Sequence, residues 1–169
     1  VYLSNNYSQA IKTDGTLWAW GNNSTGGLGN GTTSWYSSPI QIGSLTNWKQ
    51  VACGFYHTIT TKTDGTLWAW GNGANGQLGN GTQINYSSPI QVGTLTNWKQ
   101  VSGGYYHIAA IKTDGTLWTC GYNNAGQLGN GGATVFFYSS PIQIGTLTNW
   151  KQVSAGQYQT VPISSPDLP

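Results

Sequence analysis

The sequence contains no arginine, no glutamate and no methionine, and only 6% of its 169 residues are charged, whereas about a quarter are charged in an average globular protein. Its six lysines fall at two repeated positions, so they form no dense basic stripe of the kind that a phosphate backbone requires. No apolar run approaches the roughly 18 residues of a membrane-spanning helix. The sequence therefore predicts a protein that binds no nucleic acid and has no membrane span.

Carboxylates are equally scarce. Asp14, Asp64 and Asp114 each precede a glycine in a predicted turn, and Asp167 lies in the last few residues. Neither the paired carboxylates of general acid–base catalysis nor a Ser–His–Asp set can be assembled from side chains held in turns. We therefore predict no enzymatic activity and no cofactor.

Histidine occurs twice, as His57 and His107, at one and the same repeat position. The other copies carry Tyr7 and Gln159 there. Neither of these could replace a catalytic base, so we predict two structural histidines that contact the backbone near a Gly-x-x-His corner. A metal site shared by the two histidines is the alternative, although zinc usually takes four ligands and the sequence offers no others nearby.

Disulfide bonds are not predicted. Cys53 and Cys120 fall at different positions of different repeats. A disulfide needs Cα atoms about 5.5 Å apart, which two such positions would not supply. We expect two buried free thiols.

Aromatic residues and glycine, by contrast, are abundant: 9 Trp, 10 Tyr and 25 Gly. Disordered chains are poor in aromatics, so a folded protein is indicated. The phrase "KTDGTLWAWGN" occupies residues 12–22 and again 62–72, and "KTDGTLWTCGY" occupies residues 112–122. Such a fixed spacing of 50 residues is the signature of a repeat architecture.

Each repeat predicts four short strands and no helix. In the second copy these are "NWKQVACG" (47–54), "HTITTK" (57–62), "TLWAWG" (66–71) and "SSPIQV" (87–92). Between the second and third strands, Asp-Gly predicts a hairpin turn in which both turn residues have positive φ. Four antiparallel strands cannot bury both faces alone, and radially stacked four-stranded units form a β-propeller.

The fold expected is therefore an all-β propeller of about three and a half blades with fourteen strands. We assign three repeats and a partial fourth, then a short tail: 1–50, 51–100, 101–152, 153–163 and 164–169. Between blades we expect packing of the apolar residues of the repeated phrase, namely Leu17, Trp18, Trp20, Leu67, Trp68, Trp70, Leu117 and Trp118.

The second and third copies closely resemble the regulator-of-chromosome-condensation repeat. They carry, in order, Gly-x-x-His, an Asp-Gly turn, Trp-x-Trp-Gly or its variant Trp-Thr-Cys-Gly, then Gly-Gln-Leu-Gly-x-Gly and a proline. The resemblance implies a propeller, usually of seven blades. Members of this family include guanine-nucleotide exchange factors bound to chromatin, a plant UV-B photoreceptor and a secreted β-lactamase inhibitor, so it also implies a protein partner.

One stretch of each repeat is not copied faithfully: "TTSWY" (32–36), "TQINY" (82–86) and "GATVFFY" (132–138). Large apolar groups in variable loops are typical of interfaces. We predict a partner-binding surface formed by Trp35, Tyr36, Ile84, Tyr86, Val135, Phe136, Phe137 and Tyr138. The alternatives are that these residues cover the outer blade edge or contact a neighbouring subunit.

Three functions are consistent with this sequence. The first is a non-enzymatic module that binds a protein through the aromatic loops. The second is a carbohydrate-binding or adhesion module, since sugars stack on Trp and Tyr. The third is a structural subunit of an extracellular assembly. Few charges and several Asn-x-Ser/Thr sequons favour an extracellular or cell-surface location; the sequons are at Asn6, Asn23, Asn30, Asn80 and Asn85.

The final half-blade lacks its third and fourth strands, because "SSPDLP" stands where "KTDGT" would follow. Since the chain begins at Val1 and not at Met, we expect further sequence before it. Propellers need about four or more blades to close. We therefore expect one of two arrangements: the chain is the C-terminal half of a seven-bladed ring, or it self-associates through its open blade faces.

Overall fold

The computed structural model describes residues 2–3, 6–132 and 136–165. In these residues it contains fourteen β-strands and no helix, as the sequence predicts. No helix in the described part of the chain is therefore long and apolar enough to cross a membrane.

The strands form three four-stranded sheets, or blades, and one two-stranded sheet. Blade 1 contains β1 (Tyr2–Leu3), β2 (Tyr7–Ile11), β3 (Leu17–Gly21) and β4 (Tyr36–Gln41). Blade 2 contains β5 (Trp48–Cys53), β6 (His57–Lys62), β7 (Leu67–Gly71) and β8 (Tyr86–Gln91). Blade 3 contains β9 (Trp98–Gly103), β10 (His107–Lys112), β11 (Leu117–Tyr122) and β12 (Phe137–Gln143). The half-blade contains β13 (Trp150–Ala155) and β14 (Thr160–Ser164).

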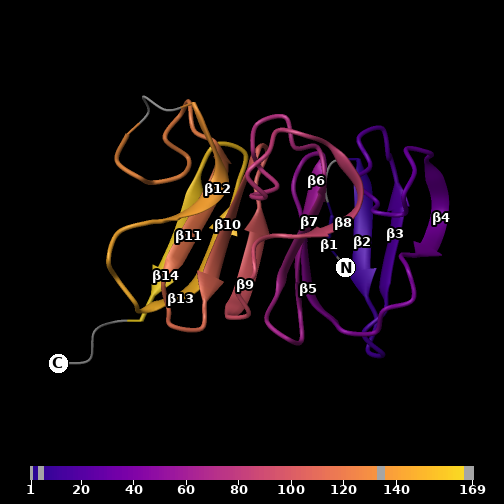
Figure 1. Ribbon diagram of the computed structural model, residues 1–169, viewed down its shortest axis with the longest axis horizontal. Helices are drawn as coiled ribbons and strands as arrows, with labels where there is room; N and C mark the ends of the chain where they lie inside the picture. Colours follow the sequence, from indigo (N-terminus) through magenta and orange to yellow (C-terminus); the bar gives the residue numbers. More distant parts are fainter. Residues whose placement is uncertain (1, 4–5, 133–135, 166–169) are drawn as a thin grey trace.

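Within each blade the strands follow one another in chain order and pair antiparallel. The first strands of successive blades, β5, β9 and β13, contact one another, so they are the innermost strands. The fourth strands lie at the outer edge. Figure 1 shows the blades succeeding one another across the molecule, from blade 1 in indigo to the half-blade in yellow. The prediction of a propeller with about three and a half blades is confirmed.

Each blade has two ends with different turns. His57 pairs with Gly71, and Gly71 pairs with Tyr86. The turn between the first two strands and the loop between the last two therefore lie at the same end, which we call the corner face. The hairpins at residues 13–15, 63–65 and 113–115 lie at the opposite end, the hairpin face.

The Asp-Gly hairpins differ from the predicted turn. Lys12 N donates to Thr16 O at 3.0 Å, and Gly15 N donates to Lys12 O at 2.9 Å. Gly15 has φ 79°, but no residue other than glycine has positive φ in the described part of the chain. The prediction of two positive-φ residues is therefore wrong: the loop has three residues, with glycine alone in the left-handed position.

The rest of the repeated phrase is explained by side-chain bonds beside this turn. Asp14 Oδ1 accepts hydrogen bonds from N and Oγ1 of Thr16 at 2.9 and 2.6 Å. Trp18 Nε1 then donates to Thr16 Oγ1 at 2.9 Å. The same three bonds recur in blades 2 and 3. Because all three aspartates accept bonds in this way, the pKa of each of these carboxyls is lowered.

Successive blades are joined through the glycine-rich loop of the earlier blade. The carbonyl oxygen of Gly27 accepts hydrogen bonds from Thr58 Oγ1 at 3.0 Å and from Trp70 Nε1 at 2.9 Å. A Cβ added at Gly29 would lie 2.6 Å from Trp70 Nε1. Only glycine therefore permits the loop to approach the next blade so closely.

Two further sets of bonds join the blades on either side of this contact. At the outer edge, Gly31 N donates to Ser87 O at 2.8 Å, and Gly81 N donates to Ser139 O at 2.7 Å. At the inner strands, the amide group of Gln50 both donates to Val101 O and accepts from Val101 N, each at 3.2 Å. Blades 2 and 3 are thus joined both at their inner strands and at the outer edge, and blades 1 and 2 through the glycine-rich loop and the outer edge.

The apolar residues of the repeated phrase divide into two groups. Leu17, Leu67 and Leu117 are buried, as predicted. Trp70 is also fully buried, whereas Trp18, Trp20, Trp68 and Trp118 are only partly buried. The interblade space is therefore filled by the leucines and Trp70 more than by the other tryptophans.

We predict that Trp70→Ala lowers the free energy of unfolding by about 3–5 kcal/mol, as large-to-small core changes do. The variant also leaves the Gly27 carbonyl without one of its donors. Trp20→Ala is the matched control, because Trp20 holds the same repeat position but is partly exposed. Urea unfolding followed by circular dichroism measures both. Equal losses would contradict the role assigned to the loop contact.

Candidate functional site

The variable loops place three apolar side chains in solvent on the corner face. Trp35 is 67% exposed, Ile84 is 58% exposed and Phe136 is 65% exposed. Each belongs to a different blade, and no ring contact joins them in the described part of the chain. The surface is therefore a row of separate exposed groups, which we call the loop tips.

The other predicted site residues have different surroundings. Tyr36, Tyr86, Phe137 and Tyr138 are partly buried where the outer strands begin. Tyr36 and Tyr86 pack against the apolar core, and Tyr138 Oη accepts a hydrogen bond from Asn130. These tyrosines therefore support the loops. Val135 lies outside the described residues.

A second aromatic group on the corner face was not predicted. Phe55 and Tyr105 stack with ring centroids 4.1 Å apart and planes at 25°, and Tyr105 stacks on Tyr158 at 6.1 Å and 30°. Tyr56 and Tyr106 each pack edge-on against the preceding ring, both at 4.4 Å. This ladder links the corners of blade 2, blade 3 and the half-blade. The aromatic pairs that precede both histidines, "FYH" and "YYH", were the signal in the sequence.

The two histidines lie beneath this ladder and are buried. Burial, followed by the nearby His107, lowers the pKa of His57 to about 3. Burial also lowers the pKa of His107 to about 4, against an opposing hydrogen bond to the backbone of Gln159. A Cβ added at Gly54 would lie 2.1 Å from His57 Cε1, so the glycine of Gly-x-x-His makes room for the ring. Both rings are neutral parts of the core near pH 7.

Neither a metal centre nor a reactive thiol is assembled in the described part of the chain. It contains no group of three or more His, Cys, Asp or Glu side chains that could hold a metal ion. Both cysteines are free, as predicted. Burial raises the pKa of Cys53 to about 12 and raises that of Cys120 further. Both therefore remain thiols, which are poor nucleophiles.

Comparison with family models identifies the repeat. Residues 14–60, 64–111 and 114–163 match the model described as the regulator of chromosome condensation (RCC1) repeat. A second model of this repeat matches residues 48–77 and 98–127. No curated protein sequence matches the chain significantly.

Solved structures match the fold over nearly the whole chain. Human WBSCR16 is 23% identical, with a TM-score of 0.83 over 98% of this chain and 44% of its own. Prp20p from Saccharomyces cerevisiae is 19% identical, with a TM-score of 0.84 over 98% of this chain and 43% of its own. Yeast RCC1 (Prp20), solved bound to Kap60, is 24% identical to this chain, with a TM-score of 0.83. The match covers 95% of this chain and 38% of the yeast RCC1 chain. The chain thus spans less than half the length of these structures.

We predict that stability falls as the pH drops below about 6.5, where the histidines of the unfolded chain become protonated. Between that value and the folded-state pKa values of about 3 and 4, the unfolded chain binds more protons. Each histidine then lowers the free energy of unfolding by up to about 1.4 kcal/mol per pH unit. Urea unfolding at pH 7.5, 6.0 and 4.8 measures this dependence.

His107→Gln is the matched control, because Gln159 holds the same repeat position in the half-blade. The variant should lose about half of the pH dependence. A free energy of unfolding that stays constant between pH 6.5 and 4.8 would show that the histidines are not buried as neutral rings.

Proposed function

This chain belongs to the regulator of chromosome condensation (RCC1) repeat family, and from that membership we propose that it is a non-enzymatic module that binds a protein partner through the loop tips. The observation that carries the proposal is the exposure of Trp35, Ile84 and Phe136 at one face of a rigid scaffold. A solvent-exposed tryptophan such as Trp35 is a typical anchor of protein interfaces, and Ile84 and Phe136 extend the apolar row across the next two blades.

Relatives with this fold bind proteins. Prp20p is described with binding properties to Gsp1p and histones, and yeast RCC1 (Prp20) has been solved bound to Kap60. Their identity to this chain is 19% and 24%, which does not transfer a partner. The chemistry of the loop tips indicates instead an apolar partner surface, because the described part of this face presents few charges.

We also propose that the half-blade end binds the last two strands of another repeat. At the two complete interfaces, a glycine of the loop lies close to the outer strand of the next blade. A Cβ added at Gly26 would be 2.6 Å from Ser87 Cα, and one added at Gly76 would be 2.7 Å from Ser139 Cα. Gly126 has the same positive φ, 74°, yet an added Cβ meets nothing within 4 Å among the described residues. Its loop is shaped for a strand that this part of the chain does not supply.

The side chains at this end match that proposal. Val161 and Ile163 on β14 are 52% and 55% exposed, whereas the equivalent strand β10 is buried throughout. Gln100 Oε1 accepts a bond from Val153 N at 3.2 Å, and the equivalent Gln152 is exposed. An additional repeat, whether from the same polypeptide or from a second copy, would cover these groups.

For the loop tips, we predict that Trp35→Ser, Ile84→Ser and Phe136→Ser together reduce partner capture at least tenfold. The reason is that the three changes remove the exposed apolar groups without altering a core residue. The measurement is cross-linking capture from the source organism, quantified by mass spectrometry. Circular dichroism checks that the variant is folded.

The matched control changes three exposed leucines of the hairpin face, Leu45, Leu95 and Leu147, to serine. Their exposed fractions are 46%, 48% and 52%, close to those of the loop tips. The control should capture the same proteins as the unaltered chain. Equal capture by both variants would refute a binding site at the loop tips.

For the half-blade end, we predict that the Gly131 amide exchanges with solvent faster than those of Gly31 and Gly81, which donate to Ser87 and Ser139. The test variant carries a second copy of residues 113–149 joined after Ser164, which supplies the two missing strands. In this variant the exchange of the Gly131 amide should slow to the rates of the Gly31 and Gly81 amides. Nuclear magnetic resonance hydrogen exchange measures all three. Slow Gly131 exchange in the monomeric original chain, or no change on extension, would contradict the proposal.

A further inference from the structure

Two equivalent cavities lie between blades toward the hairpin face, opposite the loop tips. The cavity between blades 2 and 3 has a volume of about 280 Å³, and the one between blades 1 and 2 has about 370 Å³. All nine residues that line the second cavity have their repeat equivalents in the lining of the first. Small-molecule sites span about 300–1,000 Å³; the larger cavity lies at the small end of this range and the other just below it.

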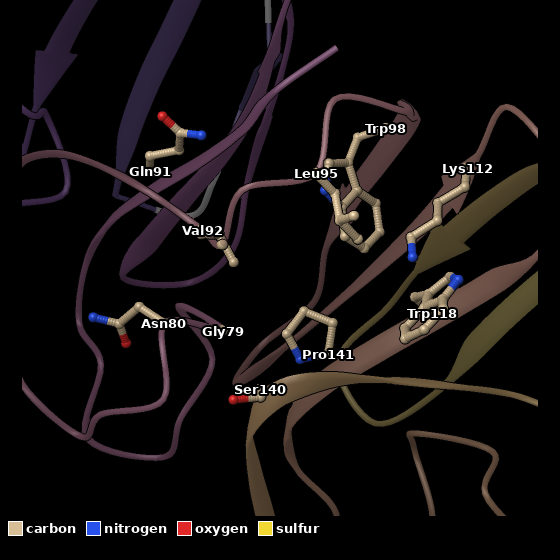
Figure 2. A pocket seen from close by; sticks show the side chains of 11 residues that line it. Gly79, Asn80, Gln91, Val92, Leu95, Trp98, Lys112, Trp118, Ser140 and Pro141 are labelled. Atoms are coloured by element: carbon tan, nitrogen blue, oxygen red, sulfur yellow. The ribbon is translucent and has the colours of Figure 1, made fainter.

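The walls of the cavity between blades 2 and 3 are mostly apolar. Trp98 and Trp118 stand edge to face, with ring centroids 6.1 Å apart and planes at 80°. Figure 2 shows their side chains arranged with those of Val92, Leu95 and Pro141 around one space. In the other cavity Trp48 and Trp68 take the same positions, with centroids 6.1 Å apart and planes at 83°. An aromatic or branched apolar group would be enclosed on several sides.

A positive charge lies against these aromatic walls. Lys112 lines the cavity, and its Nζ lies 3.5 Å from the ring centroid of Trp118 and 4.8 Å from that of Trp98. Lys62 holds the equivalent repeat position and lies over the same two rings, 3.6 Å from Trp68 and 4.7 Å from Trp48, but it lies behind the nine residues that line the second cavity. Both lysines are only 5% exposed. Most of each side chain is therefore covered, and desolvation lowers the pKa of both ammonium groups, which lie over the tryptophan faces.

The cavity also has a hydrogen-bond donor without an acceptor. Trp98 is 3% exposed, and its Nε1 has no hydrogen-bond partner among the described residues. Trp48 Nε1 is in the same condition. No carboxylate lines either cavity. The nearest acidic group along the chain, Asp114, accepts two bonds from Thr116. This N–H is covered within the cavity wall, so the polar group that lines the space between blades 2 and 3 beside the tryptophans is the Lys112 ammonium.

We propose that these two cavities are binding sites for small aromatic or branched apolar carboxylates. The apolar body of the ligand would pack against the tryptophan and the aliphatic side chains of the cavity wall, and its carboxylate would lie toward the lysine ammonium. The positive charge selects an anion. The apolar walls disfavour a sugar, since most of its hydroxyl groups would find no partner there.

The repeat geometry sets the number of sites at two. Beside the half-blade, Trp150 is present with its Nε1 also unpaired, but the equivalent of Trp118 would belong to a third strand that the half-blade lacks. A third cavity of this kind is therefore not formed by the described residues. Because both cavities lie away from the loop tips, their occupation and partner capture can succeed or fail independently.

The test uses the whole chain with 2-naphthoate as the probe and 2-naphthamide as its uncharged counterpart. Isothermal titration calorimetry should give two equivalents of 2-naphthoate per chain, and at least tenfold weaker binding of the amide. This comparison requires no variant, so it does not depend on the folding of one. Equal affinity for the two compounds, or no saturable binding at millimolar probe, would overturn the proposal.

Lysine variants then assign the sites. Lys112→Gln should leave one equivalent, and the double variant Lys62→Gln/Lys112→Gln should weaken the remaining binding at least tenfold. Lys12→Gln is the matched control, because Lys12 lies over Trp18 at 4.0 Å but is exposed and lines neither cavity. Two equivalents should remain in this control. Binding that is unchanged in the double variant would place the probe elsewhere and refute the sites.

Discussion

The contact between the glycine-rich loop of one blade and the next blade is the constraint on which the rest of the structure depends. At Gly27, one carbonyl oxygen accepts hydrogen bonds from Gln9, Thr58 and Trp70. Gln9 belongs to the same blade as the loop, and the other two belong to the next one. This single acceptor therefore fixes two sheets relative to each other. The cavity between blades 1 and 2 depends on that relative position, since its lining combines residues of both blades.

The two faces use the same scaffold in different ways. On the corner face, the loops between the third and fourth strands differ from blade to blade, so each blade presents a different side chain to solvent. On the hairpin face, the cavity linings are nearly the same in both interblade spaces. A varied surface suits one extended partner that contacts several blades at once. Repeated cavities suit several copies of one small ligand.

Much of the fold could be predicted from the sequence because the period repeats the strand pattern three times. The hairpin type could not, since the bonds from Thr16 to the Asp14 carboxylate favour a turn in which Gly15 alone needs positive φ. The exposure of Trp35 could be anticipated from its variable loop. The ladder of Phe55, Tyr105 and Tyr158 could not, because its contacts form only when separate corners meet. The cavities also escaped prediction, since each lining combines segments of two adjacent blades.

The order of the blades has a consequence for synthesis. Because the loop of each blade is covered only by the next one, a nascent chain exposes that loop until about 50 further residues have been added. At translation rates of about 5–20 residues per second, this takes roughly 3–10 s. During that time the Gly27 carbonyl lacks the two donors that the next blade supplies, Thr58 and Trp70, and the site that will receive Trp70 is open. Within this chain, each blade therefore completes the cover of the blade before it, and the most recently synthesised loop is the least protected one.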